Sequence, residues 1–331
     1  SGPNPDAMRE LFTSFGFSMT HKHKLKNIEY FNQGDIHFLL NTEQGSFAES
    51  FFKAHGPCVS AMGWRVKDAK KALAVAVERG AKKAENGDYL DQQGQPIPAI
   101  VGIGDSLIYF IEDYVDAARY QKLGFEPHPN PRKIESKGFY VIDHLTNNVP
   151  QGTMAEWSDF YRNVFGFTDV RYFDIKGAKT GLTSYALRSP CTKFCIPINE
   201  GTEAKSQINE YLREYKGPGV QHIAFATNDI VASLRALKST AIETLDIDDQ
   251  YYQEVFDRVP NVSENHKELQ ELGILVDGDQ EGYLLQIFTR NIIGPIFIEI
   301  IQRKNHHAFG EGNFGALFRS IERDQEKRGV L

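Results

Sequence analysis

The pattern of apolar and polar residues along the chain predicts short strands and amphipathic helices in mixed order. At 229–239, for example, Ile230, Leu234 and Leu237 recur at helical spacing after an apolar strand. Because the predicted strands gather in runs between the helices, the pattern favours an α+β fold over a doubly wound parallel sheet. In the second half we predict strands at 139–149, 169–175, 181–188, 193–198, 219–227, 284–289 and 296–301, with helices at 154–165, 205–215 and 229–239.

The chain contains an internal repeat. Segment 56–81 can be laid over segment 217–242, because both begin Gly-Pro-X-Val, continue into a short apolar strand and then reach a polar turn and a helix. Upstream, SFGF at 14–17 matches VFGF at 164–167. The two offsets, 161 and 150 residues, differ by a plausible loop insertion, so we expect two related modules.

A proline-rich segment separates these modules. Residues 126–137 hold three prolines and mixed charge between two apolar stretches, which predicts an interdomain linker. The N-terminal module then covers 1–125, and the C-terminal module covers 138–331 and ends in an amphipathic helix at 313–329. The counterpart of the strand at 139–149 would fall before residue 1, so we expect the first strand of the N-terminal module to be missing.

Composition limits the classes of function. The 331 residues suit about two domains, and 44 acidic against 37 basic side chains argue against nucleic acid as a partner. No apolar run approaches the roughly 20 residues that span a bilayer, and the N-terminus lacks the apolar region of a signal peptide. Three cysteines (Cys58, Cys191, Cys195) do not make a disulfide framework. We therefore expect a cytoplasmic protein that binds neither nucleic acid nor a membrane.

Two histidines and one glutamate stand out as candidates for chemistry. His144 and His222 lie in apolar strand-like runs, and Glu299 lies among isoleucines with no Lys or Arg within three residues. A buried carboxylate without a cation is costly, and a metal ion would satisfy all three groups. Two His and one carboxylate form the ligand set of non-haem Fe(II) oxygenases, and zinc with a water is the competing interpretation. For either histidine alone, a hydrogen-bonded core residue is the simpler alternative.

The repeat provides an internal comparison for these candidates. In the first copy, Ala61 aligns with His222, and Glu299 falls near Phe110. A purely structural requirement would have placed similar residues in both copies. The pattern therefore indicates one catalytic module, the C-terminal one, and one non-catalytic module.

Several motifs resemble those of the 4-hydroxyphenylpyruvate dioxygenases, a family of the vicinal-oxygen-chelate superfamily. They are FYVIDHLTNNV, PINEGTEAKSQINEYL, GVQHIAFATNDI, FIEI and the ending FGEGNFGALFRSIERDQEKRG. The resemblance implies two tandem modules of βαβββ repeats, with Fe(II) only in the C-terminal module. It also implies conversion of 4-hydroxyphenylpyruvate and O2 to homogentisate and CO2 in tyrosine and phenylalanine catabolism. Oxidative decarboxylation, ring hydroxylation and side-chain migration would produce homogentisate, with the substrate's own 2-oxo acid in place of 2-oxoglutarate.

The same resemblance implies roles for individual residues. His144, His222 and Glu299 would be the Fe(II) ligands and the catalytic centre. The substrate pocket would be lined by Ser184, Asn199, Gln207, Gln221, Gln286, Phe288, Phe297, Phe309, Phe314 and Leu317. Of these, Phe309, Phe314 and Leu317 would belong to the C-terminal helix and the segment leading into it, which close over the site.

Three alternatives to this function remain. The nearest is 4-hydroxymandelate synthase, which hydroxylates the benzylic carbon of the same substrate. The others are a divalent-metal lyase or isomerase of the same fold, and a non-enzymatic protein that sequesters a ligand. We further expect a homo-oligomer, either a dimer or a tetramer, because the non-catalytic module must have some use.

Overall fold

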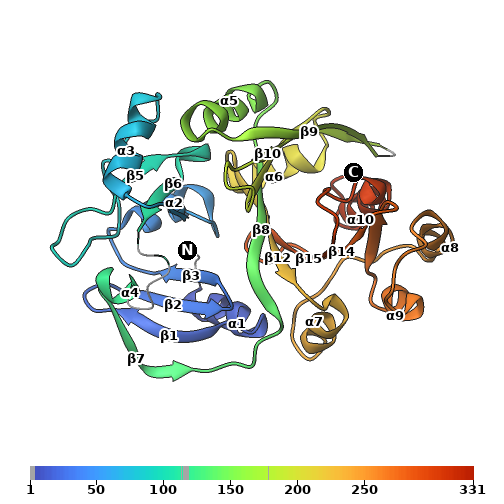
Figure 1. Ribbon diagram of the computed structural model, residues 1–331, viewed down its shortest axis with the longest axis horizontal. Helices are drawn as coiled ribbons and strands as arrows, with labels where there is room; N and C mark the ends of the chain where they lie inside the picture. The colour runs from blue at the N-terminus through green and yellow to red at the C-terminus, as the bar shows by residue number, and fades with distance from the viewer. Residues whose placement is uncertain (1–3, 113, 115–118, 178) are drawn as a thin grey trace.

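The structure is a computed structural model that describes residues 4–112, 114, 119–177 and 179–331. Two α+β halves lie side by side, with most helices on the outside of the sheets (Figure 1). The first half contains α1 (Pro5–Ser14), β1 (Ser18–His23), β2 (Ile28–Gln33), β3 (Ile36–Asn41), α2 (Phe47–His55), β4 (Ala61–Arg65), α3 (Ala69–Glu78), β5 (Ala99–Val101), η1 (Ile103–Asp105), β6 (Leu107–Ile111), α4 (Arg119–Lys122) and β7 (Phe125–Arg132).

The second half is larger and ends in the C-terminal helix. Its elements are β8 (Phe139–Asn148), α5 (Met154–Phe165), β9 (Thr168–Lys176), β10 (Gly181–Arg188), β11 (Cys195–Gly201), α6 (Gln207–Tyr215), β12 (Gly219–Thr227), α7 (Ile230–Leu237), α8 (Asp249–Arg258), α9 (His266–Glu271), β13 (Leu275–Gly278), β14 (Tyr283–Phe288), β15 (Phe297–Lys304), η2 (Glu311–Asn313) and α10 (Phe314–Lys327). Each helix and strand predicted in this half is present, with ends that differ by a few residues.

The strand connections repeat between the halves. In the second half, eight strands form one sheet in the order β13-β14-β15-β12-β8-β11-β10-β9. There β12 pairs parallel with β15, and β15 pairs antiparallel with β14. In the first half, β4 pairs parallel with β6, and β6 pairs antiparallel with β5. This shared connectivity agrees with an internal duplication.

The halves differ at the strand that joins their two parts. In the second half, β8 pairs with both β11 and β12 and so makes one continuous sheet. In the first half, the sheets β3-β2-β1-β7 and β4-β6-β5 are separate. Within the described ranges, no strand of the first half joins β3 to β4 as β8 joins β11 to β12.

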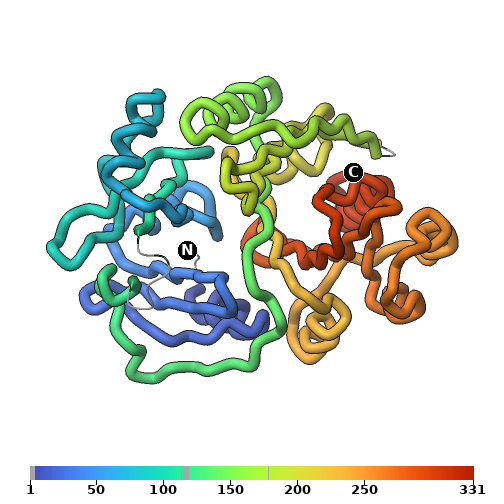
Figure 2. Tube along the Cα trace, in the orientation of Figure 1, coloured from blue at the N-terminus to red at the C-terminus, as the bar shows by residue number. Residues whose placement is uncertain are grey.

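The segment predicted as an interdomain linker, 126–137, is partly a strand. Residues up to Arg132 belong to β7, which pairs antiparallel with β1 at the edge of the four-stranded sheet. Its three prolines occupy every second position, so the ring nitrogens, which carry no hydrogen, all face one side. An edge strand forms hydrogen bonds on one side only, so it can contain prolines on the other side. The same three prolines had predicted a linker from the sequence. The structure corrects the linker to the residues between β7 and β8, and Figure 2 shows the chain crossing there from one half to the other.

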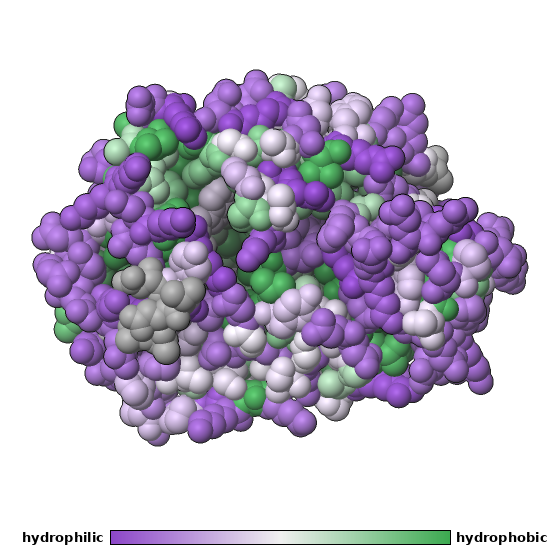
Figure 3. Space-filling model, viewed as in Figure 1, coloured by the Kyte–Doolittle hydropathy of each residue, from purple (hydrophilic) through white to green (hydrophobic). Residues whose placement is uncertain are grey.

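One hydrophobic core extends through both halves. Phe225 of β12 packs its ring against Phe15, Phe17 and Phe38 of the first half, at centroid distances of 5.7, 5.6 and 6.0 Å. Each such aromatic pair contributes about 0.5–1.5 kcal/mol beyond its burial. We therefore expect the two modules to unfold as one unit. On the face drawn in Figure 3 the surface is mostly hydrophilic, and hydrophobic residues gather at a hollow near its middle. No helix in the described part of the chain is long and apolar enough to cross a membrane.

Candidate metal centre and active site

Three adjacent strands bring His144, His222 and Glu299 to one point. His144 lies on β8, His222 on the central strand β12 and Glu299 on β15. Oε2 of Glu299 lies 3.0 Å from Nε2 of His144 and 3.4 Å from Nε2 of His222, and the two Nε2 atoms are 3.3 Å apart. All three side chains are buried, and one ligand atom from each lies within 4.8 Å of the others.

The chemistry of these donors suits a divalent cation. Burial works against charge on His144, but Glu299 and Asp143 outweigh it and raise the pKa of His144 to about 9. Burial likewise opposes charge on Glu299, yet the two histidines hold the pKa of Glu299 down at about 2. Burial lowers the pKa of His222, so this ring is neutral at pH 7. The Glu299 carboxylate and the neutral His222 ring thus face the same point, and His144 carries one proton there. A metal ion can replace that proton.

Two β-bulges control which side chains face this point. On β12, Val220 pairs with Asn147 and His222 with Thr146, so Gln221 is an extra residue without a partner on β8. On β8, His144 pairs with Ala224 and Ile142 with Phe225, so Asp143 is extra in the same way. A bulge breaks the alternation of faces and re-aims a side chain.

Each extra residue hydrogen-bonds the histidine that follows it. Oδ2 of Asp143 lies 2.8 Å from Nδ1 of His144, and Oε1 of Gln221 lies 3.0 Å from Nδ1 of His222. When each Nδ1–H donates to its neighbour's oxygen, Nε2 is left with its lone pair toward the metal site. Gln221 was predicted only as a pocket residue, and the structure also places it against this ring.

Five polar residues predicted for the pocket lie in the same half. Asn199 of β11 donates from Nδ2 to Oε1 of Gln221 and to Oδ1 of Asn148, each at 3.4 Å. Ser184 of β10 is buried and pairs with Asn199 across the strands. Gln207, the first residue of α6, lines a cleft together with Gln221 and Phe297.

Gln286 of β14 differs from the other amides. It is only 1% exposed, and within the described residues neither its Nε2 nor its Oε1 has a hydrogen-bond partner. A buried amide without partners costs about 1–3 kcal/mol. Gly310, just before η2, lies close against this amide, since a Cβ there would be 2.4 Å from Nε2 of Gln286. The unpaired amide therefore marks a place where a polar ligand would be stabilised.

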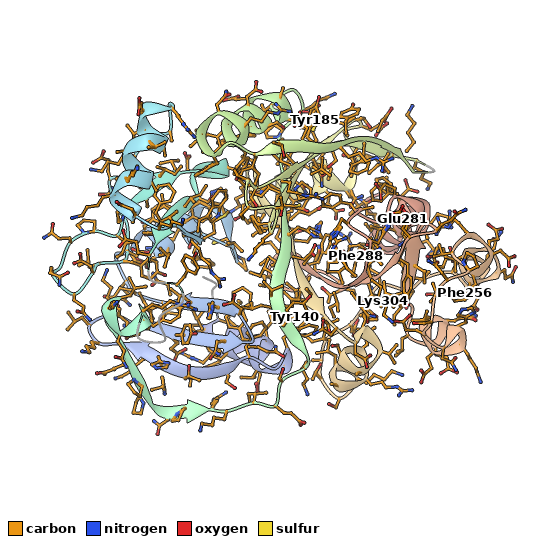
Figure 4. The ribbon with its side chains drawn as sticks, in the orientation of Figure 1. Tyr140, Tyr185, Phe256, Glu281, Phe288 and Lys304 are labelled. Atoms are coloured by element: carbon orange, nitrogen blue, oxygen red, sulfur yellow. The ribbon has the colours of Figure 1, made fainter. Side chains whose placement is uncertain are left out.

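Aromatic side chains enclose the metal site. The ring of Phe297 stacks on His222 with centroids 4.9 Å apart, and Phe288 meets Phe297 edge-on at 6.0 Å. On the other side, Phe309 lies 5.7 Å from His144. Figure 4 places Phe288 in the interior of the second half, whereas Phe256 lies on the outer helix α8.

The C-terminal residues reach the site through a further aromatic residue. Phe173 of β9 contacts both Phe309 and Phe314, at 6.2 and 5.4 Å. Leu317 on α10 packs against the main hydrophobic core, and no contact found among the described residues joins it to the metal ligands.

Four polar residues near the metal site were not predicted. All four lie on the two outer strands that carry a metal ligand, β8 and β15: Asp143, Thr146, Asn148 and Arg303. Oγ1 of Thr146 is 3.0 Å from Nε2 of His222. The one sequence signal available for Asp143 and Arg303 was charge inside an apolar strand, the same signal that drew attention to Glu299.

The fold and the three-residue cluster together define the class of protein. Two related α+β modules, of which the second alone brings two His and one Glu together among the described residues, are typical of a vicinal-oxygen-chelate protein with one metal centre. The Glyoxalase/Bleomycin resistance protein/Dioxygenase superfamily model matches residues 141–286, and the model for the N-terminal part of hydroxyphenylpyruvate dioxygenase matches residues 1–126.

Full-length relatives identify the family. The chain is 57% identical to Protein MelA of Shewanella colwelliana, covering 99% of this chain and 94% of that protein. It is 45% identical to 4-hydroxyphenylpyruvate dioxygenase of Pseudomonas aeruginosa, covering 99% and 93%. The solved structure of a mutant 4-hydroxymandelate synthase from Streptomyces coelicolor superposes with a TM-score of 0.81 over 98% of this chain and 96% of that one, at 22% identity, and shares the fold.

The chain belongs to the 4-hydroxyphenylpyruvate dioxygenase family. This confirms the predicted resemblance, the α+β fold of tandem vicinal-oxygen-chelate modules and the prediction that the protein is a dioxygenase enzyme.

Proposed function

We propose that the protein is an Fe(II)-dependent 4-hydroxyphenylpyruvate dioxygenase that converts its substrate and O2 to homogentisate and CO2. The observation that carries the proposal is the buried convergence of His144, His222 and Glu299 in a chain of this family. Two imidazoles and a carboxylate suit Fe(II) and leave other coordination positions open. Bound there, iron would supply the coordination of the 2-oxo acid and the reduction of O2.

The chain's own contribution is to bind the substrate, orient it and exclude water. We assign the substrate ring to the space between Phe297 and Phe288 on one side and Phe309 on the other. These aromatic groups are held by contact with the two histidines, so they place the ring next to the metal site. The same apolar wall keeps water from the reacting carbons.

The buried amides provide the polar contacts of the pocket. We assign Gln286, whose amide has no partner in the described chain, to an oxygen of the substrate. Asn199, Gln207 and Gln221 would orient the remaining oxygens, with Ser184 behind Asn199. A site built to hydrogen-bond a substrate oxygen rejects analogues that lack it, because its own polar groups are then left unpaired.

The C-terminal helix α10 contributes residues to a cleft that reaches this pocket, and ion pairs hold the helix in place. Arg290 contacts Asp324 at 2.9 Å, and Arg328 forms an ion pair with Glu210 of α6. These residues also line the cleft that reaches Gln207 and Phe297. We infer that the substrate enters between α6 and α10, and that movement of α10 closes the site.

The test is turnover of 4-hydroxyphenylpyruvate with each metal in turn. The metal-free protein is supplied with Fe(II) or Zn(II), with and without O2, and the products are separated and identified by mass. The proposal predicts homogentisate and CO2 only with Fe(II) and O2. Turnover with Zn(II) or without O2 would instead indicate the lyase or isomerase, and binding without turnover would indicate the sequestering protein.

The product also separates the proposal from its nearest rival. Release of 4-hydroxymandelate in place of homogentisate would show benzylic hydroxylation by a 4-hydroxymandelate synthase. The fold is shared with that enzyme, so the fold does not decide between them. The identity to proteins named 4-hydroxyphenylpyruvate dioxygenase over nearly the whole chain favours ring hydroxylation.

We also propose the setting of the reaction. The protein would act in the cytoplasm, in tyrosine and phenylalanine catabolism, as a homo-oligomer of two or four chains. In the part of the chain that the structure describes, none of the three cysteines forms a disulfide, as expected in a reducing compartment. Light scattering of the metal-loaded protein tests the assembly, and a monomer at micromolar concentration would contradict that part.

A further inference from the structure

A partly buried ion pair lies directly behind the metal ligand His144. Oδ1 of Asp143 accepts a hydrogen bond from Nε of Arg303, and Oδ2 accepts one from Nη2, both at 2.8 Å. The same Oδ2 faces Nδ1 of His144 at 2.8 Å. Both charged side chains are only 18% exposed. A buried ion pair adds little net stability once its desolvation is counted, so stability alone does not account for this one.

The ion pair connects two of the three ligand strands. Asp143 immediately precedes His144 on β8, and Arg303 lies four residues after Glu299 on β15. Because Asp143 is the extra residue of the β-bulge, its side chain can face the same side as that of His144. A regular strand would point the two residues to opposite faces.

Arg303 also binds the segment that leads into the C-terminal helix. Its Nη1 donates to the carbonyl oxygens of His306 and Ala308, at 3.1 and 2.6 Å. The next residue, Phe309, places its ring against His144. One guanidinium thus holds the carboxylate behind the metal ligand and the backbone that carries an aromatic wall of the pocket.

We propose that Asp143 and Arg303 are positioning residues for the metal centre. Asp143 fixes the ring and tautomer of His144, so that its Nε2 faces the metal, and Arg303 fixes Asp143 and the segment 306–308 together. Acceptors behind a ligating histidine orient the ring and raise its basicity. His222 has the neutral Gln221 in the same place, so the charged acceptor is specific to His144. The proposal rests on the function proposed above, because it concerns how that site holds its metal.

Metal affinity is the decisive measurement, since it does not depend on turnover. Metal-free wild type, Asp143→Asn and Asp143→Ala are titrated anaerobically with Fe(II), and with Co(II) to record its visible spectrum. Loss of such an acceptor weakens metal binding about 10–100-fold. We expect Asp143→Ala to lose this much and to change the Co(II) spectrum. Asp143→Asn keeps an acceptor oxygen and should lose less.

Two further variants separate positioning from folding. The double variant Asp143→Leu/Arg303→Met replaces the ion pair with apolar side chains, which often restores stability. Arg303→Lys keeps the charge but loses the two-pronged contact to Asp143. As a matched control, Asp88→Asn removes another buried carboxylate, which accepts from Asn41 and from the backbone of α2 in the first half. The control should bind metal as the wild type does, even if its melting temperature falls.

The kinetic constants provide the second readout. Asp143→Asn should lower kcat at saturating metal with KM nearly unchanged, whereas Arg303→Lys should also raise KM, because it frees the segment before Phe309. Wild-type metal affinity in any folded variant of Asp143 would overturn the proposal. A wild type that makes no homogentisate, with affinity still falling in Asp143→Ala, would refute the proposed function and leave the positioning role standing.

Discussion

Metal binding should release one proton, and its affinity should therefore depend on pH. In the metal-free site the pKa of His144 is about 9 and that of Glu299 is about 2, so a proton remains between their facing atoms through the neutral range. Burial lowers the pKa of His222, so that ring is neutral, and a proton on Nδ1 that is donated to Oε1 of Gln221 leaves the facing Nε2 unprotonated. A metal ion must displace the proton on His144, because a ligating nitrogen must be free.

The size of the effect follows from the pKa. Below a pKa of about 9, each unit of pH changes the apparent affinity about tenfold, which is about 1.4 kcal/mol. Half of the protein is already deprotonated at the pKa, so the gain between pH 7 and pH 9 is about 50-fold, or about 2.3 kcal/mol. The apparent affinity for the metal ion should rise with pH and reach a plateau above the pKa of His144. An ordinary histidine would reach that plateau already above a pKa of about 6.5.

Calorimetry measures both parts of this prediction. Co(II) or Zn(II) is titrated into the metal-free protein at pH 6, 7 and 8, in buffers that differ in ionisation enthalpy. The dependence of the heat on the buffer should correspond to about one proton released per metal ion. An affinity that stays constant from pH 7 to pH 8, with no proton released, would refute the reasoning.

Further predictions concern the ligands, the pocket, the core and metal removal. Glu299→Ala should lose both metal binding and homogentisate formation, and an active, iron-retaining variant would contradict the assignment. Gly310→Ala places a Cβ against Gln286 at a residue with φ +78°, so it should lower the free energy of unfolding in denaturant by about 1–2 kcal/mol and raise KM. An unchanged KM would count against the assignment of Gln286 to the substrate. Phe225→Ala should cost about 3–5 kcal/mol and keep a single unfolding transition, whereas two transitions would contradict the shared core. Removing the metal with a chelator should lower the melting temperature by mass action, and no change would mean that the folded site holds no metal.

Much of the second half could be predicted from periodicity alone. Its helices α5, α6 and α7 and strands β8 to β12 match the predicted ranges closely, because each is an apolar run with clear ends. The helices α8 and α9 were not predicted, since their sequence is mostly polar and buries few residues. The proline-rich strand β7 was misread as linker because pattern reasoning does not show which strand lies at a sheet edge.

The metal ligands could be predicted because each is a polar side chain inside an apolar run, where burial without a partner would cost free energy. Glu299 stands in a run of isoleucines, and the copy of the repeat without ligands gave a control. The bulges could not be predicted in the same way, because they depend on pairing with a strand far along the chain. Strict alternation would have put Asp143 and Gln221 on the face opposite their histidines. Their contacts with His144 and His222 therefore become visible only in the folded sheet.

The measurement that tests the central claim most directly is turnover of 4-hydroxyphenylpyruvate by the Fe(II) protein under ¹⁸O2. The account predicts homogentisate with two heavy oxygen atoms, one in the new ring hydroxyl and one in the carboxylate left by decarboxylation, together with one CO2 for each product. The Glu299→Ala protein should give neither product. Formation of labelled 4-hydroxymandelate, or of product without heavy oxygen, would contradict the account.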